Sequence, residues 1–212
     1  MDYFIKQLQD RLTGALPGAE AQYRMAHGSR KGLYGHPENA KKAGVLALFY
    51  PKAQDWHLVF IERVSNHKDR HSGQISFPGG RFEPADGHLG NTALREAEEE
   101  IGIAQKDVQV LGALSQLYIP VSNFLVHPYV GFIDYTPNFQ PEVSEVANIL
   151  ETPFKAFLQK ENVAKKAIQL PGNLVLKDVP HFSVANKVIW GATAMMMSEL
   201  VVLAEELSLS GD

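Results

Sequence analysis

The chain has 212 residues, 45% of them apolar, so it can bury one sizeable core, and one domain is the simplest expectation. Its formal net charge at pH 7 is −4 and its basic residues are scattered, which excludes the positive surface that nucleic acids and anionic membranes require. The chain has no cysteine, which excludes disulfides, thiolate zinc sites and thiol nucleophiles, so any metal must be held by oxygen or imidazole.

The first predicted element is an amphipathic helix over residues 2–13, where apolar residues recur at helical spacing. Charges interrupt this segment every few residues, so it lacks the apolar core of a signal peptide, and we expect a cytoplasmic protein. A polar stretch rich in glycine follows. We therefore expect residues 1–42 to form a helix and an irregular extension, which packs outside the domain at 43–212 or contributes to a homodimer.

Two strands are predicted next, at 43–50 (AGVLALFY) and 56–63 (WHLVFIER), with a turn between them at PKAQD. The segment after the second strand is polar, rich in glycine and without a sustained apolar period. A loop of that length inside a compact domain is usually functional. Its FPGG, at 77–80, lets the backbone approach a ligand closely, and we expect the N–H groups there to suit phosphate oxygens.

An acidic helix is expected to begin at Asn91 or Thr92, either of which can cap it, and to end at Gly102. The rest of the chain is expected to form strands at 108–119 and 124–134, a short helix at 154–158, a hairpin at 167–178 turned at Pro171 and Gly172, and a helix from about 191 to 206. The last helix falls short of the roughly 18 uninterrupted apolar residues of a membrane span, so we interpret it as buried. The class is mixed α and β in layers.

The acidic helix carries its glutamates near its carbonyl end, where each costs up to about 1 kcal/mol because the helix dipole is negative there. Glu96, Glu99 and Glu100 lie three and four positions apart, so they share one face. A hard cation such as Mg²⁺ or Mn²⁺ would neutralise their repulsion. The alternative interpretation is a solvated glutamate face on a surface helix.

The run GRFEPADGHLGNTALREAEEEIGI resembles the Nudix box. The box positions are taken by Gly80, Asp86, Arg95, Glu96, Ala97, Glu99, Glu100, Gly102 and Ile103. The match has two departures. Eight residues separate Asp86 from Arg95, where the general pattern has seven, and aspartate stands where glutamate is usual.

This resemblance implies a Nudix α/β/α sandwich, with a mixed β-sheet between helices, and a hydrolase that cleaves a diphosphate linked to another group. It implies that Glu96, Glu99 and Glu100 ligate Mg²⁺ or Mn²⁺ with the Gly80 carbonyl. Arg95 would orient a carboxylate of the box by charge-assisted hydrogen bonds, the alternative being an ordinary i, i+4 pair with Glu99.

The general base that takes a proton from water is left open. The candidates are Glu99, Glu100, Glu142 and Glu145. The last two belong to PEVSEV, which resembles the acidic turn that many Nudix members have after their central sheet. Plain surface charge is the alternative for that pair.

Upstream, VFIER followed by RHSGQISFPGG is similar to a segment of the coenzyme A diphosphatase branch of the family. Arg63, Arg70, Gly73 and the FPGG supply its features. Only two residues lie between Arg70 and Gly73, where the branch has three, and the span from Arg63 to Gly73 is one residue longer. IWGATAMMMSEL resembles the C-terminal helix of the same branch.

The expected reaction is therefore metal-dependent hydrolysis of coenzyme A, or a related small-molecule nucleoside diphosphate derivative, to 3′,5′-ADP and 4′-phosphopantetheine. The residues expected to bind the substrate are Arg63, Arg70, Phe77, Gly79, Gly80 and Arg81. One alternative keeps the chemistry and changes the substrate to ADP-ribose, a dinucleotide or a nucleoside triphosphate. Another, from a different class, is a catalytically silent nucleotide-binding sensor.

Overall fold

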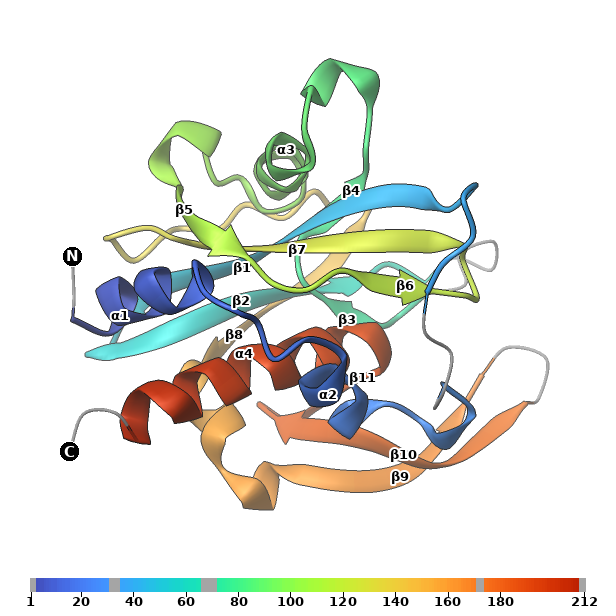
Figure 1. Ribbon diagram of the computed structural model, residues 1–212. Helices are drawn as coiled ribbons and strands as arrows, with labels where there is room; N and C mark the ends of the chain where they lie inside the picture. The colour runs from blue at the N-terminus through green and yellow to red at the C-terminus, as the bar shows by residue number, and fades with distance from the viewer. Residues whose placement is uncertain (1–2, 31–34, 66–71, 171–173, 210–212) are drawn as a thin grey trace.

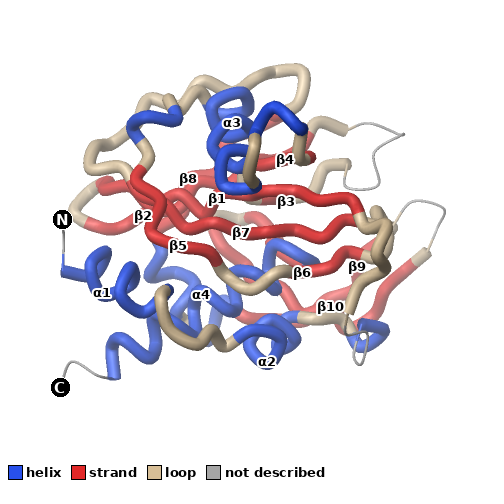
Figure 2. Tube along the Cα trace, turned by 45° about the horizontal axis from the view of Figure 1, so that its top comes forward, coloured by secondary structure: helices blue, strands red, loops and turns tan. Residues whose placement is uncertain are grey.

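The computed structural model describes residues 3–30, 35–65, 72–170 and 174–209, with side chains described as far as 207. A mixed eight-stranded sheet lies between α3 (Leu89–Ile101) on one face and α1 (Tyr3–Leu12) with α4 (Gly191–Leu209) on the other (Figure 1). Figure 2 shows the same layers from a second angle, with the strands between the helices. The predicted α/β/α sandwich is confirmed.

The large sheet is built around β1 (Lys41–Lys52). Its other strands are β2 (Asp55–Arg63), β3 (Ile75–Ser76), β4 (Gly79–Arg81), β5 (Gln109–Ala113), β6 (Leu117–Ile119), β7 (Phe124–Phe132) and β8 (Val146–Pro153). One edge of β1 pairs antiparallel with β2 and β4, and the other pairs in parallel with β7, in register from Lys41↔Phe124 to Phe49↔Phe132. Residues 46–50 are fully buried because helices cover both faces of the sheet.

The two strands predicted at 43–50 and 56–63 are confirmed as β1 and β2, each slightly longer than expected. Their turn places Ala53 and Gln54 at φ of 51° and 66°, between the paired Lys52 and Asp55. Two successive residues with positive φ match the right-handed twist of a hairpin.

The acidic helix begins earlier than predicted, because neither Asn91 nor Thr92 caps it. The N-cap is His88, whose Nδ1 accepts a hydrogen bond from the backbone N–H of Asn91. The predicted end is confirmed, since Gly102 has a φ of 73°. The helix packs directly on the backbone of β1. A Cβ at Gly44 would lie 2.4 Å from the carbonyl oxygen of Leu89, so only glycine permits this approach.

The segment predicted as one strand at 108–119 is two strands, β5 and β6. The Leu114 N–H donates to the carbonyl of Pro128 on β7, and Pro128 has no N–H to return. The next N–H, that of Ser115, turns away and donates to the Glu199 carboxylate at 3.2 Å. The ladder is therefore interrupted by a proline on one strand and a buried acid on the opposite helix.

A smaller sheet is formed by β9 (Val163–Gln169), β10 (Val175–Val184) and β11 (Lys187–Trp190). The predicted hairpin is confirmed by the pairing of Gln169 with Val175, while its turn residues Pro171 and Gly172 lie outside the described residues. The predicted short helix at 154–158 is a 3₁₀ turn, η5 (Phe154–Leu158). Strand β8 was not predicted; it pairs with β2, and its half-exposed, irregular pattern does not alternate.

The N-terminal residues are part of the main core. Ile5 and Leu8 of α1 are fully buried, and α2 (Gly18–Gln22), η1 (Tyr23–Met25) and η2 (Gly28–Arg30) continue across the face that carries α4. Glu199 of α4, also fully buried, accepts hydrogen bonds from the Gly18 N–H at 3.0 Å and the Gln22 amide at 2.9 Å. A boundary at residue 42 stays a prediction, as does a homodimer.

The final helix is buried as predicted, with Met195, Met197 and Leu200 fully inaccessible to solvent. Among the helices in the described ranges, none has both the length and the apolar character needed to cross a membrane. A cytoplasmic location stays a prediction.

Candidate active site

The candidate site lies where β4 meets α3, and its backbone is glycine for steric reasons. A Cβ at Gly80 would lie 2.4 Å from the Glu96 carboxylate, and one at Gly79 would lie 2.4 Å from the Gly44 carbonyl oxygen. The Gly79 N–H donates to the Glu100 carboxylate at 2.8 Å. Our expectation that this N–H serves a phosphate is therefore wrong for Gly79, because a helix carboxylate already accepts from it.

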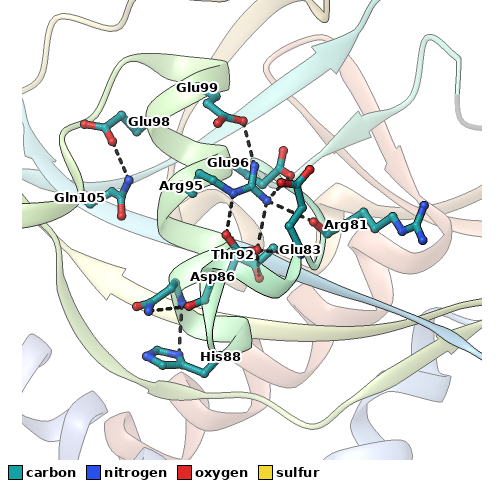
Figure 3. Close-up of polar contacts among 11 residues, drawn as sticks. Arg81, Glu83, Asp86, His88, Thr92, Arg95, Glu96, Glu98, Glu99 and Gln105 are labelled. Carbon is teal, nitrogen blue, oxygen red and sulfur yellow. Dashed lines mark hydrogen bonds and ion pairs between the residues drawn. The ribbon is translucent and has the colours of Figure 1, made fainter.

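Arg95 is the centre of a network of carboxylates (Figure 3). Its Nε donates to Asp86 at 2.7 Å, its Nη2 lies 2.9 Å from a Glu96 oxygen, and its Nη1 donates to Glu99 at 2.9 Å. The i, i+4 pair with Glu99 thus exists beside the predicted contacts to other acids. The hydrogen bonds from Arg95 hold the pKa of Asp86 well below its usual range.

Asp86 joins the loop to the helix despite the longer spacing before Arg95. It ends a 3₁₀ turn, η3 (Pro84–Asp86), and its carboxylate accepts from the Glu83 N–H at 2.9 Å and the Thr92 hydroxyl at 2.8 Å. Only 8% of Asp86 is exposed. Asp86 is a box residue with no role predicted from the sequence, and its contact with Arg95 supplies one.

The three box glutamates differ in burial. Glu100 is 2% exposed, and burial raises its pKa to about 8, with smaller upward contributions from the charges of Glu96 and Glu145. Burial also raises the pKa of Glu96, and the charges of Glu99 and Glu145 add to that effect. Glu99 is exposed. The cluster therefore groups more carboxyl side chains than cationic ones, since Arg95 and Arg63 are the cations that pair with them in the described residues.

The two acids of the later loop have different surroundings. Glu145 is close enough to Glu96 and Glu100 for its charge to raise both of their pKa values. The Glu142 carboxylate instead accepts from the N–H and the hydroxyl of Ser144, at 3.1 and 2.9 Å, which lowers its pKa. The structure thus brings Glu145 toward the box and directs Glu142 to its own turn.

These donors fit a hard divalent cation in chemistry, since they are carboxylates in excess of their cationic partners. Within the described ranges, no three acidic or imidazole side chains already converge as a metal site. The reason is visible in Figure 3, where Glu96 and Glu99 turn toward Arg95. Coordination would require these two side chains to exchange Arg95 for the cation.

A cavity of about 760 Å³ borders the acidic cluster. Its walls are largely apolar and come from β1, β4, the β6–β7 turn, β10, the start of α4 and the 27–30 segment. Gly79, Gly80 and Arg81 line it. Arg63 also lines it, with its Nη1 3.7 Å from a Glu100 oxygen. Strand β4 and Arg63 therefore lie between the cavity and the glutamates.

The two remaining residues predicted to bind the substrate, Phe77 and Arg70, have different outcomes. Phe77 is 1% exposed and stacks on Phe60 with ring centroids 4.9 Å apart, so most of its surface belongs to the core, although it also borders the cavity. Arg70 lies outside the described residues. The 27–30 segment also lines the cavity, a contribution that was not predicted because that segment carries no motif.

The chain is similar to known proteins over most of its length. The family model described as the NUDIX domain matches residues 40–170. The Nudix hydrolase NudL of Yersinia enterocolitica is 37% identical over 142 residues, covering 67% of this chain and 71% of that protein. NudL of Yersinia pestis is 34% identical over 151 residues, covering 71% and 73%. Among solved structures, the Nudix hydrolase RenU of M. smegmatis superposes with a TM-score of 0.54 at 13% identity, covering 82% of this chain and 88% of RenU, which shows a shared fold.

Proposed function

The chain belongs to the Nudix hydrolase family, and we propose that it hydrolyses the diphosphate linkage of coenzyme A or a related nucleotide derivative. Coenzyme A would yield 3′,5′-ADP and 4′-phosphopantetheine. Family members generally use divalent metal ions, and we propose Mg²⁺ or Mn²⁺ here because the donors are oxygen atoms.

The observation that carries this proposal is the large apolar cavity beside the acidic cluster. A diphosphate held at β4 would have Glu96 and Glu100 on one side and the cavity on the other. A substrate that extends well beyond its diphosphate, through a long and partly apolar group such as pantetheine, would fill such a space. A nucleoside triphosphate carries a nucleoside on one side of its phosphates and no second organic group on the other.

Each residue of the cluster then has a proposed role. Glu96, Glu99 and Glu100, with the Gly80 carbonyl, would hold the metal, which when bound screens the diphosphate and makes a water more acidic. Arg95, fixed by Asp86, would hold Glu96 and Glu99 in place until the metal arrives. Arg63 and Arg81 border both regions and would pair with phosphate oxygens.

We favour Glu145 as the general base, because its charge acts on the pKa of both Glu96 and Glu100 although it is not one of the three helix carboxylates. Glu142 is a weaker candidate because Ser144 already occupies its carboxylate. Exchange of Glu145 for glutamine should lower kcat more than it changes metal affinity. A loss of metal affinity with kcat unchanged would assign Glu145 to the metal instead.

The test is a phosphate-release screen with Mg²⁺ and then Mn²⁺, using coenzyme A, acetyl-coenzyme A, ADP-ribose, dinucleotides and nucleoside triphosphates. A tenfold preference in kcat/KM for coenzyme A, equal to about 1.4 kcal/mol, supports the proposed substrate. A preference for ADP-ribose or a dinucleotide would keep the chemistry and change the substrate.

A matched pair of variants tests the site itself. Glu99→Gln should lower metal-dependent hydrolysis by at least about 100-fold, the scale expected for loss of a positioned group. Glu98→Gln is the control, because Glu98 is on the same helix and exposed, with its carboxylate accepting from Gln105 instead. Equal activity of both variants would favour the sensor interpretation or another site.

A further inference from the structure

The cavity has a second polar end, formed by residues that the family box does not include. In the described part of the chain, four buried side-chain polar atoms have no hydrogen-bond partner: Arg30 Nε, Ser122 Oγ, His127 Nε2 and Thr152 Oγ1. Of these residues, Arg30 and Ser122 line the cavity. A buried polar group without a partner destabilises the fold, so two of them at one cavity require an explanation.

Arg30 and Ser122 lie at the same end of the cavity. The Nη2 of Arg30 donates to the carbonyl of Tyr118, and the Ser122 N–H donates to the carbonyl of the next residue, Ile119, at 3.3 Å. Both contacts therefore converge on the end of β6 and the turn that follows it. The Arg30 guanidinium is partly buried, and desolvation lowers its pKa, so its charge is not fully offset by water.

The segment that carries Arg30 is fixed on both sides of the cavity. His27 contacts the carbonyl of Lys177 on β10 through its Nε2 at 3.0 Å, and Arg30 contacts β6. In Figure 1 this blue segment lies beside β10. In the sequence it is far from the box, which begins at Gly80. It also precedes residue 40, where the match to the family model begins. Residues 27–30 therefore lie outside the part of the chain that matches the family model.

We propose that Arg30 and Ser122 bind a phosphate monoester of the substrate, at the end of the cavity away from the diphosphate. This inference rests on the proposed function, because it assumes that the diphosphate lies at β4. A phosphate monoester supplies acceptors for the free Arg30 donor and for the Ser122 hydroxyl, and its charge matches a guanidinium in apolar surroundings. The residues would select substrates that carry such a group over those that lack it.

Matched substrate pairs that differ by one phosphate monoester test this selection. Coenzyme A is compared with dephospho-coenzyme A, NADPH with NADH, and ADP-ribose 2′-phosphate with ADP-ribose. We expect wild type to favour the phosphorylated member of at least one pair by tenfold or more in kcat/KM. Arg30→Gln should reduce that ratio at least tenfold, and Ser122→Ala should reduce it about threefold. Arg30→Lys, which keeps the charge, should restore part of the ratio.

The control is Arg24→Gln, because Arg24 is an exposed arginine in the same segment and does not line the cavity. It should keep the wild-type ratio. Thermal unfolding of each variant separates a selective effect from misfolding. Equal ratios in wild type and Arg30→Gln, or the absence of any preference in wild type, would overturn the inference.

A binding measurement keeps this test separate from the hydrolase proposal. Calorimetry without added metal compares adenosine 3′,5′-bisphosphate with AMP, and neither ligand contains a diphosphate. Tighter binding of the bisphosphate by wild type, lost in Arg30→Gln, supports the subsite even if the hydrolysis screen fails. Equal affinity of the two ligands for wild type, in an enzyme that cleaves diphosphates, contradicts the subsite alone.

Discussion

Replacement of Asp86 by asparagine tests the link between the loop and the acidic helix. The carboxylate accepts four hydrogen bonds between 2.7 and 3.2 Å, two from Arg95 and one each from Glu83 and Thr92. Asparagine keeps the shape but removes the charge, and its amide directs a donor at other donors. In the wild-type protein, the Asp86 side chain is 4% exposed and the Arg95 side chain is 22% exposed.

The expected cost follows from that geometry. Breaking a fully buried ion pair costs about 3–5 kcal/mol, and Arg95 keeps Glu96 and Glu99 as partners, so we expect about 2–3 kcal/mol. For a chain of this size, that corresponds to a decrease in Tm of about 4–12 °C. Thermal unfolding at pH 7 measures it, with the exposed Asp134→Asn as the control.

The pH dependence gives the sharper criterion. The pKa of Asp86 is lowered in the folded state, so its stabilisation is present above the unfolded pKa of about 3.9 and is lost as the pH falls through the folded value. The difference between wild type and Asp86→Asn should therefore be constant from pH 7 to about 5.5 and shrink below about pH 4. A Tm change under 1 °C at pH 7, or a difference that does not shrink in acid, refutes the reasoning.

Two further substitutions test the close approach at Gly80 and the buried carboxylate of Glu199. Gly80→Ala should displace the Glu96 carboxylate and reduce hydrolysis at least about 100-fold with the fold retained. The control Gly14→Ala, where a Cβ meets only ordinary contacts, should leave kcat/KM unchanged, and equal activities of the two variants would show that the close approach is unimportant. Glu199→Ala should destabilise the protein by about 3–5 kcal/mol in urea unfolding and expose residues 13–30 to proteolysis. The reason is that the N–H groups of Gly18 and Ser115 and the side-chain amide of Gln22 would lose their acceptor. Glu205→Ala, an exposed position on the same helix, should have neither effect.

Local sequence patterns were sufficient for much of the fold. The apolar run at 43–50 and the helical spacing between Phe4 and Leu12 predict their elements because each pattern follows from burial alone. Strand β8 has no such pattern, since it is half-exposed and is defined by its pairing with β2. The break at Ser115 was not predictable either, because it depends on Pro128 of β7 and on a buried glutamate 84 residues later.

Local sequence patterns also predict only part of the candidate site. The spacing of Glu96, Glu99 and Glu100 predicts a shared helix face, but it does not reveal that Arg95 holds two of them or that Glu100 is nearly inaccessible to solvent. The two loop acids Glu142 and Glu145 are equivalent in the sequence, and only the turn around Ser144 separates them. The position of Arg30 depends on tertiary contacts with β6, which no local pattern encodes.

The parallel pairing of β1 with β7 has a consequence for synthesis of the chain. Lys41 pairs with Phe124, 83 residues later, while the opposite edge of β1 is covered by the nearer β2 and β4. At about 5–20 residues per second, a ribosome takes about 4–17 s to translate that interval. Throughout it, an apolar strand with one open edge is available to pair with another nascent chain. The arrangement that places β1 at the centre of the sheet therefore makes the newly made protein vulnerable to aggregation until β7 emerges.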